Sequence, residues 1–227
     1  MSNTPLKIRV ITACTGAKSV TCDSPLTFDE VQQIRGGQPV PRALEMPRVP
    51  ARTLYTGRQH TTLMAGVEAI EGRCEVDLHI LSAAYGLVPG DALLYPYEAT
   101  FSGLSPKKID AMSRTLGLAS QLEVLLSTPA HVTLILLGSG YMRAARLDTM
   151  AFDASRTIVL SAASVANLAP QGALFVPLGM PEARRFGATL IALKGLLGAR
   201  FLQNFAAANT SPALPKSAEA FLALVAS

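Results

Sequence analysis

The chain has 227 residues, of which 49% are hydrophobic and 16% charged, so it holds enough apolar material for the core of one ordinary α/β domain. Its net charge of +4 permits an anionic partner without requiring one, and the scarcity of charged residues is compatible with a homodimer. Three cysteines without CxxC or Cys/His spacing indicate neither a disulfide framework nor a zinc site. We therefore expect reduced thiols in the cytoplasm, no metal and no other cofactor.

Two stretches bear on membrane association. The N-terminus has no basic region followed by an apolar one, so we expect no signal peptide. Residues 157–181 carry no charge over a length that could cross a bilayer, but Ser161, Asn167 and Pro170 interrupt them. Two short buried strands with a loop between them explain this segment better, and no membrane partner is expected.

The first predicted strand covers residues 7–14, a β-branched run typical of the central strand of an α/β domain. Its polar end and the loop after it include Thr12, Cys14, Thr15 and Lys18. A nucleotide-triphosphatase loop needs glycine directly before lysine, whereas Ala17 separates the two here. We therefore expect only that the loop backbone and Lys18 bind some anion.

Two helices and an irregular segment follow. The first helix is expected at residues 29–35, capped near Thr27 and ended by Gly36. Residues 38–50 contain four prolines and should form a surface excursion or lid without regular structure. The second helix is expected over residues 57–71, where apolar side chains recur at helical spacing.

The most informative stretch is residues 76–98. An apolar strand, residues 76–81, leads into a loop that gathers three of the five tyrosines with a serine and two carboxylates: Ser82, Tyr85, Asp91, Tyr95, Tyr97 and Glu98. Prolines 89 and 96 forbid a continuing helix, so we expect a strand followed by a structured polar loop. The alternative is purely structural: a tight turn at Tyr85 and Gly86, with the other tyrosines packing the loop.

The remaining chain continues the alternation of helices and strands. In order, we expect a helix capped by Ser105 and running to about residue 127, a strand at 131–137, a turn and short helix from 138, strands at 157–160 and 174–177, a helix at 184–205, and, after Pro212 and Pro215, a last helix at 217–225.

This alternation predicts a single α/β domain over residues 1–227, with a mainly parallel central sheet flanked by helices. The helices after about residue 182 are expected to pack on it or to serve oligomerisation. In parallel sheets ligands bind at the carboxyl ends of the strands. Loops 12–19, 82–98, 138–143 and 179–182 would share that edge, which predicts a composite ligand site there.

The same residues carry a family resemblance. Leu81-Ser-Ala-Ala-Tyr-Gly-Leu-Val, then an Asp, then Tyr95-Pro-Tyr-Glu, resembles the pattern of the YaaA-like proteins, often labelled peroxide-stress proteins, and of their shorter uncharacterised relatives. Three flanking pieces, residues 12–19, 51–57 and 138–141, also fit the shorter relatives. The resemblance covers roughly residues 7–145 and implies a substrate related to nucleic acid or nucleobases. The helix-hairpin-helix segment of the longer members has no clear counterpart here.

We therefore expect an enzyme that cleaves or exchanges an N-glycosidic bond in a nucleoside, nucleotide or nucleic-acid base. The expected catalytic groups are a carboxylate of Asp91 or Glu98 and the hydroxyls of Ser82 and Tyr85, with Tyr95 or Tyr97 as a stacking face. The expected substrate-binding residues are Thr12, Cys14, Thr15, Lys18, Arg52, Tyr55, Gly86, Tyr97, Gly138, Tyr141 and Arg143, of which Lys18, Arg52 and Arg143 would hold a phosphate.

A second function of another class stays open. The arginines and exposed tyrosines also suit a non-catalytic nucleic-acid-binding protein of the oxidative-stress or DNA-protection type, which contacts phosphates and stacks on bases. Binding that collapses with salt, without any product, would favour this alternative.

Overall fold

A computed structural model describes residues 6–207 and 213–226. The first five residues, on which the expectation about a signal peptide rests, and Pro212 lie outside the described residues. No helix within the described ranges has both the length and the apolar character needed to cross a bilayer. The uncharged stretch that raised this question forms two strands and a short 3-10 helix, as expected in outline.

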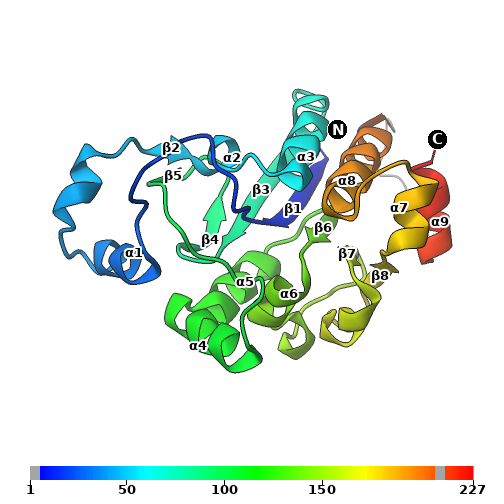
Figure 1. Cartoon of the computed structure of the whole chain (residues 1–227). Coiled ribbons are helices and arrows are strands. Elements are labelled where there is room, and N and C mark those ends of the chain that lie inside the picture. Colours follow the sequence, from blue (N-terminus) through cyan, green and yellow to red (C-terminus); the bar gives the residue numbers. More distant parts are fainter. Residues whose placement is uncertain (1–5, 208–212, 227) are drawn as a thin grey trace, which may run out of the picture.

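A six-stranded sheet forms the centre of the molecule (Figure 1). Its strands, in spatial order, are β4 (Gly86–Pro89), β3 (Glu75–Ser82), β1 (Lys7–Ala13), β6 (Val132–Leu136), β7 (Thr157–Ser161) and β8 (Leu174–Pro177). All neighbours pair in parallel except β4, which runs antiparallel to β3 at the edge. The predicted α/β class with a mainly parallel sheet is confirmed. The parallel strands follow the doubly wound order 2-1-3-4-5.

Helices cover both faces of the sheet (Figure 1). The α-helices are α1 (Phe28–Arg35), α2 (Ala51–Leu54), α3 (Arg58–Glu68), α4 (Pro106–Leu116), α5 (Leu118–Ser127), α6 (Ser139–Ala145), α7 (Met180–Arg185), α8 (Leu190–Ala207) and α9 (Ala218–Leu224). Three 3-10 helices, η1 (Pro41–Glu45), η2 (Leu147–Thr149) and η3 (Ala163–Leu168), and a small two-stranded sheet of β2 (Val49–Pro50) and β5 (Leu93–Leu94) complete the described elements.

Side chains alternate between the two faces of β1, as strand geometry requires. Ile8 and Val10 belong to the core layer under α3 and α8, whereas Ile11 belongs to the layer under α4, α5 and α6. In α8, Leu197 and Phe201 are fully buried. This helix therefore contributes to the core.

Four sequence predictions need correction. The helix expected from Ser105 to residue 127 is two helices, because Gly117 adopts a left-handed conformation (φ 67°) that ends α4. The helix expected at 184–205 is likewise divided into α7 and α8. Strand β4 occupies the first part of the expected structured polar loop. The excursion at 38–50 contains η1 and β2, so it is not wholly irregular.

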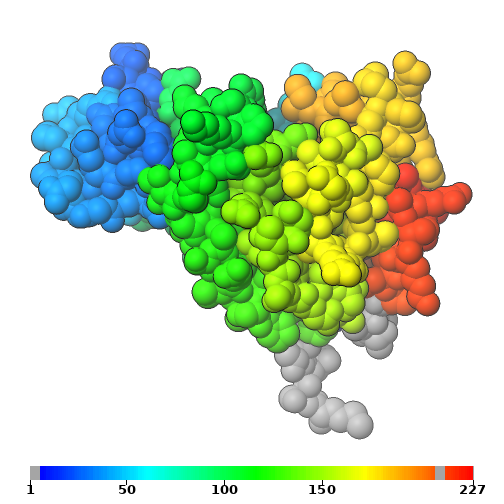
Figure 2. Space-filling view, turned by 90° about the horizontal axis from the view of Figure 1, so that it is seen from below, coloured from blue at the N-terminus to red at the C-terminus, as the bar shows by residue number. Residues whose placement is uncertain are grey.

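The N-terminal lobe, which we define as α1, η1 and β2, lies at one end of the molecule, and α9 lies at the other (Figure 2). Thr27 caps α1 as expected, since its hydroxyl accepts from Glu30 N while the Glu30 carboxylate accepts from Thr27 N. An ion pair between Arg42 and Glu30 holds η1 against α1 and lowers the pKa of Glu30 to about 2.

Candidate functional site

The carboxyl ends of β1 and β6 mark the point where the doubly wound order reverses. The chain leaves β1 toward the N-terminal lobe and α3, and it leaves β6 toward α6 on the other face, so the two loops diverge. Crevices of this kind are the usual ligand sites of open parallel sheets. Two neighbouring cavities lie at this edge.

The Lys194 cavity, of about 440 Å³, lies directly at the reversal point. Its walls come from the loop after β1, the starts of α3 and α8, and the loop into α6, through Ala13, Cys14, Thr15, Gly16, Ala17, Gly57, Arg58, Gln59, Ser102, Gly138, Tyr141, Leu190, Ile191 and Lys194. Gln59 fixes the start of α3 by donating to the hydroxyl of Thr12 (3.3 Å) and to the carbonyl of Leu136 (3.2 Å). Burial lowers the pKa of Lys194.

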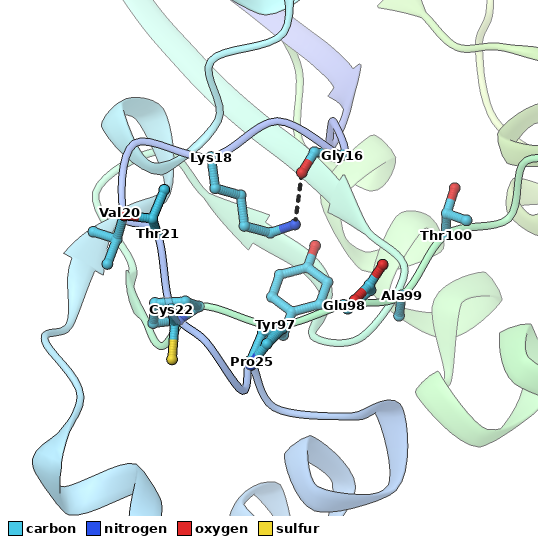
Figure 3. A pocket seen from close by; sticks show the side chains of 11 residues that line it. Gly16, Lys18, Val20, Thr21, Cys22, Pro25, Tyr97, Glu98, Ala99 and Thr100 are labelled. Carbon is cyan, nitrogen blue, oxygen red and sulfur yellow. Dashed lines mark hydrogen bonds between the residues drawn. The ribbon is translucent and has the colours of Figure 1, made fainter.

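The Glu98 cavity, of about 340 Å³, lies next to the Lys194 cavity, toward β3 (Figure 3). Gly16 lines both cavities. It is lined by Gly16, Lys18, Val20, Thr21, Cys22, Pro25, Pro96, Tyr97, Glu98, Ala99 and Thr100. Lys18 Nζ donates to the carbonyl of Gly16 (3.3 Å) and lies 4.7 Å from the centre of the Tyr97 ring. Burial lowers the pKa of Lys18, although Cys14 and Glu98 oppose this change. The exposed Glu98 carboxylate has no hydrogen-bond or ion-pair partner among residues 6–207 and 213–226.

A buried hydroxyl network supports the floor of the Glu98 cavity. Ser82, at the end of β3, is 0% exposed and donates to the Tyr97 hydroxyl (2.7 Å), which also shares a hydrogen bond with Tyr55 (2.9 Å). Ser82 Oγ in turn accepts from the backbone N of Tyr85 (3.0 Å). Burial raises the pKa of Tyr55 and Tyr97 above the usual value, so both stay neutral hydroxyls near pH 7 and neither acts as a base.

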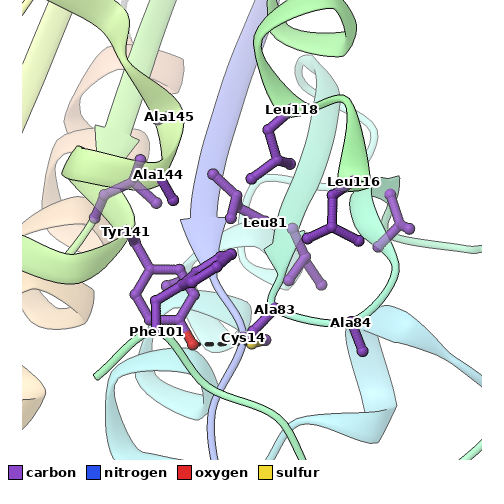
Figure 4. Close-up of a cluster of buried hydrophobic side chains, with 14 of the residues drawn as sticks. Cys14, Leu81, Ala83, Ala84, Phe101, Leu116, Leu118, Tyr141, Ala144 and Ala145 are labelled. Atoms are coloured by element: carbon purple, nitrogen blue, oxygen red, sulfur yellow. Dashed lines mark hydrogen bonds between the residues drawn. The ribbon is translucent and has the colours of Figure 1, made fainter. Parts of the chain in front are cut away.

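The hydroxyl of Tyr141 links residues of the two cavities. Cys14 Sγ and the Tyr141 hydroxyl are 3.1 Å apart (Figure 4). The same hydroxyl lies 3.4 Å from Thr100 Oγ1. Cys14 and Tyr141 line the Lys194 cavity, whereas Thr100 lines the Glu98 cavity. The two cavities therefore have Gly16 in common and are linked through the Tyr141 hydroxyl.

Ten of the residues expected in the site gather around these cavities. Seven line them: Cys14, Thr15, Lys18, Tyr97, Glu98, Gly138 and Tyr141. Three lie beneath the lining residues and bond to their neighbours: Thr12, Tyr55 and Ser82. Loop 12–19 reaches this place because residues 54–57 hold it, through Ser19 N to Leu54 O (2.8 Å) and Thr56 N to Ala17 O (3.0 Å).

Five expected residues lie elsewhere, each for a physical reason. Asp91 follows the antiparallel strand β4, and its neighbour Gly90 bonds to Leu78 O, so the hairpin carries it away from the carboxyl edge. Arg143 pairs with Asp110 of α4 (2.8 Å) and faces a different hollow.

Of the other three, Tyr85 and Gly86 fit the structural alternative of a tight turn, and Arg52 lies outside both cavities. Tyr85 donates its hydroxyl to Tyr95 O (3.3 Å), and burial raises its pKa to about 12. Gly86 makes the tight turn into β4 at φ 83°. The side chain of Arg52, on α2, lines neither cavity. Neither expected stacking face is free, because Tyr97 is 1% exposed beneath Lys18 and Arg48 covers the ring of Tyr95.

Sequence reasoning missed the cationic half of the site. Arg58 and Lys194 both line the Lys194 cavity, together with Gln59. Arg58 stands at the first position of α3, and Lys194 and Arg200 are the charged residues of α8. A lysine in the otherwise apolar first half of this helix was a usable signal. Within the described residues, no three His, Cys, Asp or Glu side chains come together as a metal site.

Replacing Ser82 with alanine should destabilise the fold by about 1–3 kcal/mol, because the N–H of Tyr85 and the hydroxyl of Tyr97 each lose a buried partner. Urea denaturation of Ser82→Ala measures this loss. The matched control is Ser127→Ala, which removes an exposed hydroxyl whose one partner among the described residues is Val124 O. Equal stability of the two variants would show that the network contributes nothing.

The buried ring of His60 should make folding sensitive to acid. His60 is 1% exposed, bonds to Arg52 O (2.8 Å) through Nε2 and leaves Nδ1 unpartnered among the described residues. Burial lowers its pKa, so the folded state resists protonation. The neutral His60 ring stabilises the folded state fully above the pKa of the unfolded state, which is near 6.5. This stabilisation is lost as the pH falls from there toward the lower pKa of the folded state.

Urea midpoints at pH 7.5 and 5.0 measure this effect. His60→Gln keeps a donor for Arg52 O but does not titrate. Between pH 7.5 and 5.0 its urea midpoint should therefore fall less than the urea midpoint of the parent chain. An equal fall of the urea midpoint in both chains would exclude His60 as the source of the acid sensitivity.

One comparison with known proteins identifies a family. A search of curated proteins finds no match. The resemblance to the YaaA-like proteins stays a prediction. A family model matches residues 44–162, just over half of the chain, including Ser82, Tyr97, Glu98 and Tyr141. The chain therefore belongs to DUF6884, a family of unknown function.

Proposed function

We propose that this protein is an enzyme that cleaves or exchanges an N-glycosidic bond in a nucleoside, nucleotide or nucleic-acid base, with Glu98 as its carboxylate. The observation that carries the proposal is the free carboxylate of Glu98 in a cavity it shares with the half-buried ammonium group of Lys18. Of the two carboxylates expected from the sequence, this one lies at the ligand edge of the sheet.

Cleavage of such a bond needs two groups. The C1′–N bond breaks with its electron pair on the base nitrogen, which takes a proton, while C1′ gains positive charge until water or a second base attacks it. Glu98 would stabilise that charge or bond to C1′ transiently, and Lys18 would protonate the departing base. The proton that the attacking water or base loses would then return Lys18 to its ammonium form. A lowered pKa makes the Lys18 ammonium a stronger acid, which suits this role.

The buried hydroxyls hold these groups in place rather than react. Tyr97 precedes Glu98 in the chain, and its hydroxyl is fixed by Ser82 and Tyr55. Its ring lies under Lys18 Nζ. Ser82 and Tyr97 are thus positioning residues for both reacting groups, in place of the catalytic role first expected for Ser82.

The resemblance to the YaaA-like proteins supports a substrate of the nucleic-acid or nucleobase class. The three free cysteines support the reducing, cytoplasmic location that goes with it. The homodimer stays a prediction.

The test is direct. The protein is incubated with DNA, RNA, nucleosides and nucleotides, and released bases are sought by mass spectrometry. Release from at least one class is the expected result. Silence across the panel would contradict the proposal. Nucleic-acid affinity that falls steeply with salt, without product, would then favour the non-catalytic binding protein.

A further inference from the structure

The Lys194 cavity has an unbalanced charge. Two side chains with positive charge, Arg58 and Lys194, line it, and no aspartate or glutamate does. Neither side chain has a hydrogen-bond or ion-pair partner in the part of the chain that the structure describes. An anion bound in this cavity would therefore meet positive charge that no carboxylate of its lining offsets.

The backbone adds to this potential. The first turn of α3, an eleven-residue helix, and the first turn of the eighteen-residue α8 both line the cavity, through Arg58, Gln59, Leu190 and Ile191. Helix N-termini carry partial positive charge and free N–H groups. The N–H groups of Gly16 and Ala17 in the facing loop also lack protein acceptors among the described residues.

We propose that the Lys194 cavity binds a phosphate group of the substrate, so that the enzyme acts on a nucleotide or nucleic acid rather than on a free nucleoside. The inference rests on the proposed function, because it makes this cavity the phosphate subsite beside the Glu98 cavity. Arg58 supplies a planar guanidinium and Lys194 a point charge, the two side chains that recognise phosphate most often. They replace Arg52 and Arg143, the partners expected from the sequence.

The arrangement explains two further features. Burial lowers the pKa of Lys194, a cost that a bound dianion would offset. The cavity also shares Gly16 and the Tyr141 contact with the Glu98 cavity, so a phosphate bound in it would lie beside a group bound in the other.

Binding is measured by isothermal titration calorimetry without turnover. The probes are inorganic phosphate, the four nucleoside 5′-monophosphates, the matching nucleosides and a short oligonucleotide. Inorganic phosphate should bind the parent chain, and Lys194→Met should weaken this binding at least tenfold, as should Arg58→Gln. Lys107→Met, on exposed α4, is the matched control and should change nothing. Lys194→Arg, which keeps the positive charge, should retain most of the parent chain's affinity for phosphate.

Phosphate that does not bind the parent chain, or that binds Lys194→Met and Lys107→Met equally, overturns the inference. Arg58→Gln alters an exposed residue, so it tests the site even if Lys194→Met fails to fold. Tighter binding of the monophosphates than of the oligonucleotide assigns the phosphate to a mononucleotide, and the reverse assigns it to a nucleic-acid backbone. Base release at equal rates from nucleosides and nucleotides would contradict this inference alone, whereas phosphate binding without any base release would contradict only the proposed reaction.

Discussion

Glu98→Gln should lower the rate of base release between about a hundredfold and ten-thousandfold, the usual contribution of a positioned acid or base. Glutamine keeps the size of the side chain but cannot stabilise positive charge at C1′ or bond to it. The Glu98 side chain is exposed and makes no hydrogen bond or ion pair within residues 6–207 and 213–226, so the melting temperature should not change. A loss of rate at unchanged stability therefore reports chemistry.

The measurement is the initial rate of base release on the best substrate of the panel. Asp91→Asn is the matched control, because it neutralises the other carboxylate of the same loop, which the β4 hairpin carries away from both cavities. The control should retain the parent rate. A Glu98→Gln rate within threefold of the parent would exclude the carboxylate mechanism.

The contrast between these carboxylates shows what the sequence could predict. Strand periodicity and the rule that ligands lie at carboxyl strand ends were enough to bring loops 12–19, 82–98 and 138–143 together. The position of one residue inside a loop depends on local pairing, however. Gly86 turns the chain back into β4, and this antiparallel pairing moves Asp91 to the opposite end of β3. The Tyr-Gly dipeptide was the signal for this turn.

The cationic half of the site could not be inferred in the same way. Lys194 and Arg58 are far apart in the sequence, and their meeting depends on how α8 packs across α3. That packing is set by small residues rather than by a periodic pattern. A carbon at the Cβ position of Gly66 would lie 2.4 Å from the Ala199 side chain, so only glycine allows this close approach. The glycines at positions 195 and 198 can be read from the sequence, but the helix that packs against them cannot.

Gly195→Ala should destabilise the fold by about 3 kcal/mol, at the upper end of the usual cost of overpacking. The added Cβ would lie 2.1 Å from the carbonyl oxygen of Gln59, which is backbone and cannot rotate away. Alanine is intrinsically the better helix former by about 1 kcal/mol, so propensity alone would stabilise the variant. A loss of stability therefore measures the contact between the two helices.

Thermal unfolding gives the test: a change of this size should lower the melting temperature by about 6–12 °C in a chain of this length. Gly36→Ala is the control, because its added Cβ meets its nearest neighbour at 3.4 Å and its φ of −80° suits alanine. The clash also displaces the start of α3, where Arg58 and Gln59 line the Lys194 cavity. Gly195→Ala should therefore weaken phosphate binding as well, and a variant with parent stability and parent affinity would show that α3 and α8 do not set the geometry of this site.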